Sequence, residues 1–164
     1  MSWAYIYTSI QIAFGIESVL EFAEKYWNRI DNRCLNLDDF KKCLTFICYD
    51  YEIEFKGDTY LQIKGCPMGA HFAPPFAIIT MHRIEKTALQ KLKLKHKFSP
   101  KVYVHYIDDI LLGPIERDSD FAWTVLEMFN SVNDDISFTL EAPNDQNIIN
   151  FLDLSIEIKP NKIE

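Results

Sequence analysis

The sequence has few of the features that mark secreted, membrane-spanning or low-complexity chains. Of its 164 residues only five are glycine and seven are proline, and no linker or internal repeat divides it. It has no run of about 18 apolar residues, the length typical of a transmembrane helix. The N-terminus lacks the positively charged segment and small-residue cleavage site of a signal peptide. We therefore expect an intracellular protein with one folded domain over residues 1–164.

Cysteine is scarce and irregularly spaced. The four cysteines, Cys34, Cys43, Cys48 and Cys66, form no C-x-x-C pair and stand largely among apolar neighbours. Paired C-x-x-C spacing is typical of zinc sites. We therefore expect buried free thiols in a reducing compartment, and neither disulfides nor zinc.

Positive charge is also in short supply. Lys and Arg total 17 against 24 Asp and Glu, which gives a net charge of −7. Proteins that bind nucleic acid on their own usually carry a basic surface, because phosphate contacts require Lys and Arg. The acidity therefore counts against autonomous nucleic-acid binding. A basic cluster over residues 83–101 is the exception, and it is either a phosphate-binding stretch or a solvated helix end.

Apolar residues are abundant, at 48% of the chain with 14% aromatic, which is typical of a folded domain. Helical spacing predicts helices over residues 16–30, over residues 36–47 with Asn36 as N-cap, from Pro75 to about Lys93, and over Ser119–Val132. Strand patterns lie at Ala4–Ile10, on both sides of a turn at residues 56–58, at residues 102–112, at Ile136–Leu140 and at Ile148–Ile158. Short connections favour an α+β fold, an antiparallel sheet with helices packed mainly on one face.

The most informative segment is Tyr106-Ile107-Asp108-Asp109. It joins two apolar runs, and Asp tolerates turn geometry, so the pattern predicts a tight β-hairpin. Two adjacent carboxylates on a rigid turn can hold Mg²⁺, which is commonly bound through one or two carboxylates plus substrate phosphates. An isolated Asp-Asp pair more often only forms a turn, so the choice between a turn and a metal site depends on other motifs in the chain.

Four further blocks accompany the hairpin in a definite order. They are residues 7–10 with Gly15-Ile16, residues 55–65, residues 65–74, and, after the hairpin, residues 138–141 with residues 150–154. Together the five blocks resemble the palm domain of a reverse transcriptase, most closely that of Penelope-like retroelements. The resemblance covers nearly the whole chain. Each block alone is weak evidence, whereas five blocks in the right order and spacing are specific.

The resemblance implies a retrotransposon RNA-directed DNA polymerase, a nucleotidyltransferase that extends a DNA primer with dNTPs on an RNA template. Asp108 and Asp109 of the YxDD motif would be catalytic and hold Mg²⁺ or Mn²⁺ in a two-metal reaction. Nucleotide and template contacts are implied for Tyr7, Gly65, Pro67, Met68, Gly69, Ala73, Pro74 and Tyr106. The primer-grip region matches Phe151, Leu152 and Asp153. A nuclear location is implied by the resemblance alone.

Several of these residues also have a simpler interpretation. Tyr7 matches the gate residue that rejects a 2′-hydroxyl, but it could equally be a core aromatic of a strand. Gly65 and Gly69 would let the backbone approach a base pair or phosphate, or would only form a tight loop. His71 and His105 have no second histidine at ligand spacing, so no metal site is assigned to them.

One departure from the family pattern bears directly on activity. The family's first metal carboxylate stands five residues before the gate tyrosine, and that position here is Ser2. A serine hydroxyl brings no charge to a metal site. Basic fingers, a thumb and the GIY-YIG endonuclease of many members are not recognisable, so polymerase activity would require those segments or another chain.

Two other functions therefore stay open. One is a decayed or domesticated palm that is catalytically inactive and acts as a nucleic-acid or protein binding module. The other is a small metal-dependent hydrolase using Asp108, Asp109 and Asp153, which would leave the ordered glycine and strand motifs unexplained. Met68, where many reverse transcriptases have glutamine, is accepted in the Penelope-like pattern and does not separate these alternatives.

Overall fold

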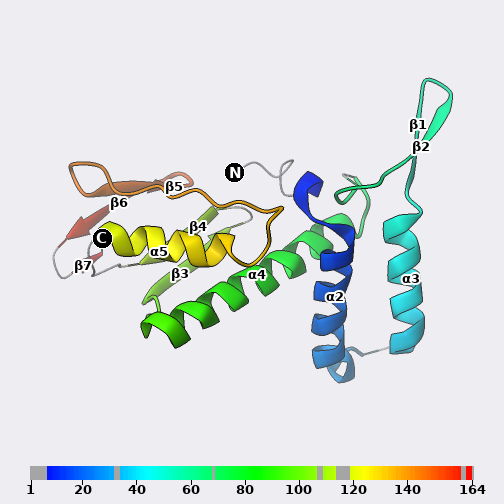
Figure 1. Ribbon diagram of the computed structural model, residues 1–164, viewed down its shortest axis with the longest axis horizontal. Coiled ribbons are helices and arrows are strands. Elements are labelled where there is room, and N and C mark those ends of the chain that lie inside the picture. The colour runs from blue at the N-terminus through cyan, green and yellow to red at the C-terminus, as the bar shows by residue number, and fades with distance from the viewer. Residues whose placement is uncertain are drawn as a thin grey trace. The chain divides into compact units, whose positions relative to one another are not determined.

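The computed structural model describes residues 7–31, 34–67, 69–106, 109–113, 119–159 and 162–163. The helices are α2 (Ile12–Tyr26), the 3-10 helix η1 (Trp27–Arg29), α3 (Leu37–Tyr49), α4 (Ala73–His96) and α5 (Ser119–Asn130). The strands are β1 (Glu52–Phe55), β2 (Asp58–Leu61), β3 (Val102–Tyr106), β4 (Asp109–Gly113), β5 (Ile148–Phe151), β6 (Leu154–Lys159) and β7 (Lys162–Ile163) (Figure 1). They form two compact units, one ending at Thr87 and one beginning at Ala88, and α4 contributes to both.

The expected α+β composition is confirmed in its coarse form. Helices alternate with antiparallel strand pairs, and the described strands pair as β1-β2, as β3-β4 and as β5-β6-β7. The single sheet that we expected is therefore not present among these strands, which form three small sheets.

The N-terminal unit is held together by helix packing. Ile16 and Val19 of α2 are buried, as are Phe76 and Met81 of α4. Gly15 allows α2 to approach α4 closely, because a Cβ added there would overlap the ring of Phe76. An alanine at this position would have to displace a buried aromatic ring.

Asn36 caps α3 as its position in the sequence predicted. Its Oδ1 accepts a hydrogen bond of 2.8 Å from the backbone N–H of Asp39, which satisfies one of the unpaired donors at the helix start. Asp38 and Asp39 in the first turn complement the positive end of the helix dipole.

The predicted hairpin over residues 51–63 is also confirmed. Strands β1 and β2 pair antiparallel and are joined by Lys56 and Gly57, with φ values of 55° and 86°. Positive φ at both central residues is the signature of a type I′ turn, whose twist matches that of the flanking strands.

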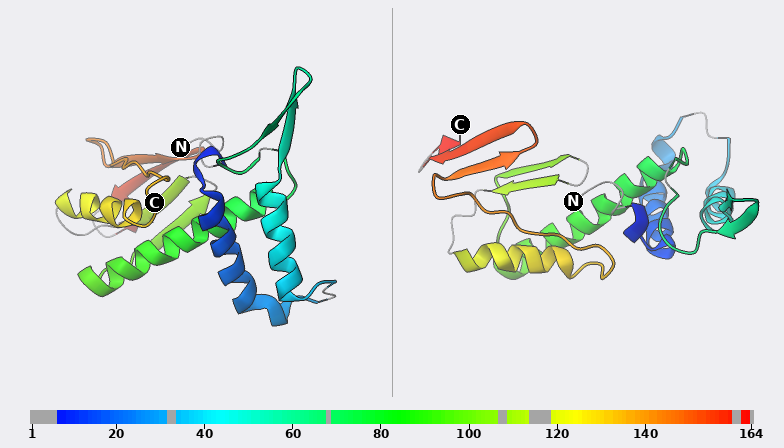
Figure 2. Two further views of the ribbon diagram at one scale, coloured as in Figure 1. Left: turned by 45° about the vertical axis from the view of Figure 1, so that its right-hand side comes forward. Right: turned by 90° about the horizontal axis from the view of Figure 1, so that it is seen from above.

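The core of the C-terminal unit lies between its two helices. It consists of Ala88 and Leu92 from α4 with Phe121, Val125 and Phe129 from α5, all buried. Side chains of Tyr103, Ile110 and Leu112 from β3 and β4 pack against it. Both helical segments therefore cover one face of the β3–β4 hairpin, as Figure 2 shows.

Two of the predicted strands are wrong. Residues 7–9 are helical, and residues 4–6 lie outside the described part of the chain. A short apolar run does not distinguish a strand from a buried helical turn. Residues 136–140 form no strand, because the side chain of Asn130 takes the place of a neighbouring strand. Its Oδ1 accepts from Phe138 N–H at 2.7 Å, and its Nδ2 donates to the Phe138 carbonyl oxygen at 3.2 Å.

The C-terminal prediction also needs correction. Residues 148–158 are a hairpin and not one strand, with Phe151 paired to Leu154 and a turn at Leu152-Asp153. Leu152 has a φ of 55°, a left-handed conformation that leucine rarely adopts, so its residue type did not indicate a turn.

Candidate functional site

The β3–β4 hairpin places the candidate catalytic segment at its closed end. Tyr106 and Asp109 are directly paired, and Ile107 and Asp108 between them lie outside the described residues. Side chains alternate along a strand, so this pair lies on the opposite face from Tyr103 and Leu112, which pack on the helices. Asp109 therefore lies on the face away from the helical core, where a ligand can reach it.

A groove of about 450 Å³ in the C-terminal unit has Asp109 among its lining residues. It is lined by β4, α5, residues 138–141 and the β5 end of the last hairpin. Asp109, Glu141, Phe151 and Leu152 all contribute to it. Residues from two of the five blocks, the hairpin and the last block, thus line one groove. Asp153 follows Leu152 in the exposed turn.

Leu152 is a strained residue at the edge of this groove. Its left-handed backbone costs a non-glycine residue roughly 1–2 kcal/mol. Its side chain is nevertheless 48% exposed, so little burial compensates for the strain. Strained, exposed residues are often kept for contact with a ligand.

The loop before α4 is fastened to the segment around Tyr7. The backbone N–H of Cys66 donates to the Tyr7 carbonyl oxygen at 2.6 Å. Gly65 has a φ of 80°, and a Cβ added there would stand 2.7 Å from that oxygen and 2.9 Å from the Thr8 Cα. Gly65 is therefore required for the contact between loop and segment, and the structure brings Tyr7 and this loop together.

The other predicted loop residues differ in exposure. Pro67 and Ala73 are buried, so their described side chains serve packing. Gly69 has a φ of 94° with open space around its Cα, and Pro74 is exposed in the first turn of α4. Of these four described residues, Gly69 and Pro74 present a surface that a ligand could contact directly. Met68 lies outside the described residues.

Burial perturbs the titratable groups beside the loop. It raises the pKa of Cys48 to about 11 and that of Cys66, with an added effect of Cys48, to about 12. Burial, and then the neighbouring Cys66, raise the pKa of Tyr7. Cys48 and Cys66 are buried as predicted, whereas Cys34 and Cys43 are exposed, so their expected burial is wrong.

The described part of the hairpin tip contains one carboxylate, that of Asp109. The carboxylate of Asp109 is the kind of oxygen ligand that Mg²⁺ prefers. Within the described ranges there is no group of three or more His, Cys, Asp or Glu side chains able to hold a metal ion. Asp108 and Ser2 fall outside those ranges.

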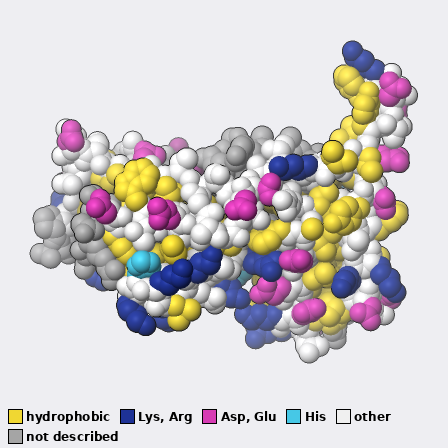
Figure 3. Space-filling view, viewed as in Figure 1, with side chains coloured by type: hydrophobic (Ala, Val, Ile, Leu, Met, Phe, Trp, Pro, Cys, Tyr) yellow, Lys and Arg dark blue, Asp and Glu magenta, His cyan; other side chains and the backbone are white. Residues whose placement is uncertain are grey.

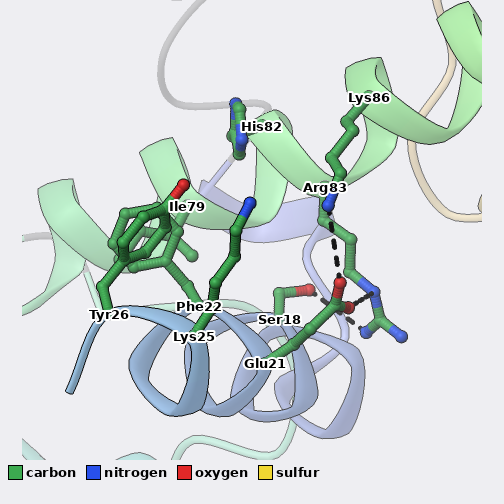
Figure 4. A pocket seen from close by; sticks show the side chains of 9 residues that line it. All are labelled: Ser18, Glu21, Phe22, Lys25, Tyr26, Ile79, His82, Arg83 and Lys86. Carbon is green, nitrogen blue, oxygen red and sulfur yellow. Dashed lines mark hydrogen bonds and ion pairs between the residues drawn. The ribbon is translucent and has the colours of Figure 1, made fainter. Parts of the chain in front are cut away.

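A second, smaller pocket lies between α2 and α4 in the N-terminal unit, with a volume of about 30 Å³ (Figure 4). The sequence did not indicate it, because it joins helices more than 50 residues apart. Lys25, Tyr26, His82 and Lys86 line it with Arg83. A hydrogen bond from Lys25 and its charge lower the pKa of Tyr26.

Some side chains of the basic cluster over residues 83–101 are engaged in ion pairs and hydrogen bonds. The Arg83 guanidinium lies 3.3 Å from Glu17 and 3.2 Å from Glu21, and Figure 4 shows its bond to Glu21. Lys91 Nζ donates to the Ser131 carbonyl oxygen at 3.1 Å and so covers the end of α5. These two cations are engaged within their own units. Lys93, Lys95 and His96 are in the last turn of α4, where positive charge complements the helix dipole.

No described helix is long and apolar enough to cross a membrane. Comparison of the chain with protein-family models, with curated proteins and with solved structures finds no match.

Proposed function

We propose that this chain is the palm of an RNA-directed DNA polymerase and carries the residues for two-metal nucleotidyl transfer. The observation that carries the proposal is the groove of the C-terminal unit. Asp109 of β4 and the β5 residue Phe151 line it together with Leu152. Helices on one face of a hairpin that has a half-buried carboxylate at its tip agree with the palm architecture expected from the motifs.

Within this proposal each described residue has a defined task. Asp109, with Asp108, would hold Mg²⁺, which would supply the charge that activates the primer 3′-OH and stabilises the leaving phosphate. Phe151 and Leu152 would position the primer strand along the groove. Gly65 would hold the loop against Tyr7, so that the exposed Gly69 and Pro74 face the template and nucleotide.

An inactive palm that only binds is the second candidate, and two observations favour it. Ser2 brings no charge where the family has its first metal carboxylate. Arg83 and Lys91 of the basic cluster are engaged within their own units, and the chain has a net charge of −7. Each cation used internally is one fewer for phosphate contacts.

Primer extension tests the polymerase proposal. The full chain is incubated with a DNA primer on an RNA template and dNTPs, first with Mg²⁺ and then with Mn²⁺. Incorporation is expected to fall by at least about 10²-fold in Asp108→Asn, because a charge is removed from the reacting centre. Asp134→Asn is the matched carboxylate control, because Asp134 is exposed in the turn after α5 and does not line the groove, and it should retain activity.

The same experiment addresses the alternative. A chain that shows no incorporation above the Asp108→Asn blank with either metal is not a polymerase by itself. Binding of a labelled primer–template in the same samples then identifies a binding module. An equal loss of incorporation in Asp134→Asn would contradict the role given to Asp108.

A further inference from the structure

The β1–β2 hairpin of the N-terminal unit presents apolar side chains to solvent. It projects beyond the end of α3 in Figure 1, and hydrophobic side chains gather over it in Figure 3. The cross-strand register puts Ile53, Phe55 and Tyr60 on one face, where they are 44%, 60% and 53% exposed. Among the described strands the hairpin pairs only with itself. A two-stranded hairpin alone is marginally stable, so a partner that covers this apolar face or extends the sheet would stabilise it.

The hydrogen-bond pattern shows which edge of the hairpin could accept another strand. Gln62 N–H donates to the Tyr51 carbonyl oxygen at 3.1 Å, so these two residues form a hydrogen-bonded pair. Hydrogen-bonded and non-hydrogen-bonded pairs alternate along an antiparallel ladder. Tyr60 therefore directs its backbone groups toward β1. Thr59 and Leu61 direct their N–H and C=O groups outward, at the free edge of β2.

The two edges of the hairpin differ in charge. On β1 the residues whose backbone groups point outward are Glu52 and Glu54, and charged side chains on an edge oppose the addition of another strand. On β2 the corresponding residues are Thr59 and Leu61, which carry no charge. Sheet extension is therefore favoured at β2. The two glutamates also disfavour a polyanion such as nucleic acid as the partner of this hairpin.

We propose that the β2 edge pairs with the β2 edge of a second copy of this chain. An antiparallel pair of identical strands has two-fold symmetry and is self-complementary in every hydrogen bond. With Tyr60 opposite its own copy, Thr59 and Leu61 exchange backbone hydrogen bonds across the axis. Asp58 then lies opposite Gln62, so no like charges meet. The result is a four-stranded sheet, β1-β2-β2-β1, in which Ile53 and Tyr60 of both copies form one continuous apolar row across a face.

Sedimentation equilibrium of the full chain tests this proposal. The interface is small, so a dissociation constant weaker than about 1 µM is expected. The average mass should rise from 19.2 kDa toward twice that value with increasing protein concentration. For a weak dimer this rise is expected at concentrations on the order of several hundred micromolar. A chain that stays at the monomer mass throughout would overturn the proposal.

Proline variants identify the edge. Thr59→Pro removes an outward N–H from β2 and should raise the dimer dissociation constant by at least about tenfold. Glu54→Pro is the matched control, because Glu54 is the cross-strand partner of Thr59 and also directs its N–H outward, on β1. Equal weakening by both variants, or no effect of Thr59→Pro, would contradict pairing through β2.

Cross-linking tests the register without relying on proline. In a Cys34→Ser, Cys43→Ser background, which removes the exposed thiols, Tyr60→Cys should form an intermolecular disulfide with oxidised glutathione. Directly opposed residues of a non-hydrogen-bonded antiparallel pair are close enough for this bond. Asp58→Cys, which faces Gln62 of the second copy, should cross-link far less. Equal cross-linking of both variants would rule out the proposed register.

Discussion

Replacement of Gly65 by alanine should destabilise the N-terminal unit through two separable effects. A left-handed backbone costs alanine roughly 1–2 kcal/mol relative to glycine, and Gly65 has a φ of 80°. The new Cβ would also stand 2.7 Å from the Tyr7 carbonyl oxygen, so the backbone must shift. Overpacking of this kind costs about 1–3 kcal/mol. We therefore expect Gly65→Ala to lower the free energy of unfolding by roughly 2–5 kcal/mol.

Gly69→Ala is the matched control for this prediction. Gly69 belongs to the same loop and has a φ of 94°, but a Cβ added there meets no atom within 4 Å. Only the backbone strain of roughly 1–2 kcal/mol applies to it. Urea unfolding followed by far-ultraviolet circular dichroism measures both variants. Equal losses of stability would show that the close approach of Gly65 to Tyr7 contributes nothing, and would refute the contact described for the loop.

Three further predictions concern turn strain, helix capping and thiol burial. Leu152→Gly should raise the free energy of unfolding by roughly 1 kcal/mol in urea titrations, because its left-handed backbone becomes unstrained; a loss of stability would contradict the strain. Asn36→Ala should lower the free energy of unfolding by about 1 kcal/mol, and Asn36→Ser should lower it much less, since a serine side chain also caps a helix. Equal free energies of unfolding for the two variants would exclude the cap. Folding raises the thiol pKa of Cys48 and Cys66 above the ordinary 9.0, to about 11 and about 12. The unfolded chain therefore loses these protons at a lower pH than the folded chain. The free energy of unfolding should be constant below pH 9 and fall above it, and this fall should be smaller in Cys48→Ala measured at the same pH values.

Local signals in the sequence predicted most of the elements correctly. Asn36 followed by two aspartates marks a helix start, and Lys56-Gly57 between alternating runs marks a hairpin, because each signal acts through its own neighbouring backbone. Residues 136–140 were predicted wrongly for the converse reason. The side chain of Asn130 makes the backbone hydrogen bonds that a neighbouring strand would normally make to Phe138. The pattern of residues 136–140 does not indicate that a side chain takes this role.

The candidate site was predictable in its residues but not in its shape. Paired Tyr106 and Asp109 follow from the motif and the hairpin pattern. The groove could not be predicted in this way, because its walls come from four separate segments that only tertiary packing brings together. These segments are β4, α5, residues 138–141 and β5. The burial of Pro67 could not be read from the sequence for the same reason. Its motif position indicates a ligand contact, whereas its burial depends on packing within the N-terminal unit.

The described sheets have a consequence for how the chain folds. Each strand pairs with its neighbour in the sequence: β1 with β2, β3 with β4, β5 with β6, and β6 with β7. Such pairings close short loops, which cost little chain entropy, and isolated hairpins form in about 1–10 µs. The slower event in the C-terminal unit should be the docking of α5 on α4, whose core residues come from more distant parts of the chain. The β3–β4 hairpin can therefore form during synthesis as soon as β4 has emerged, before α5, which follows it in the chain, is available to cover it.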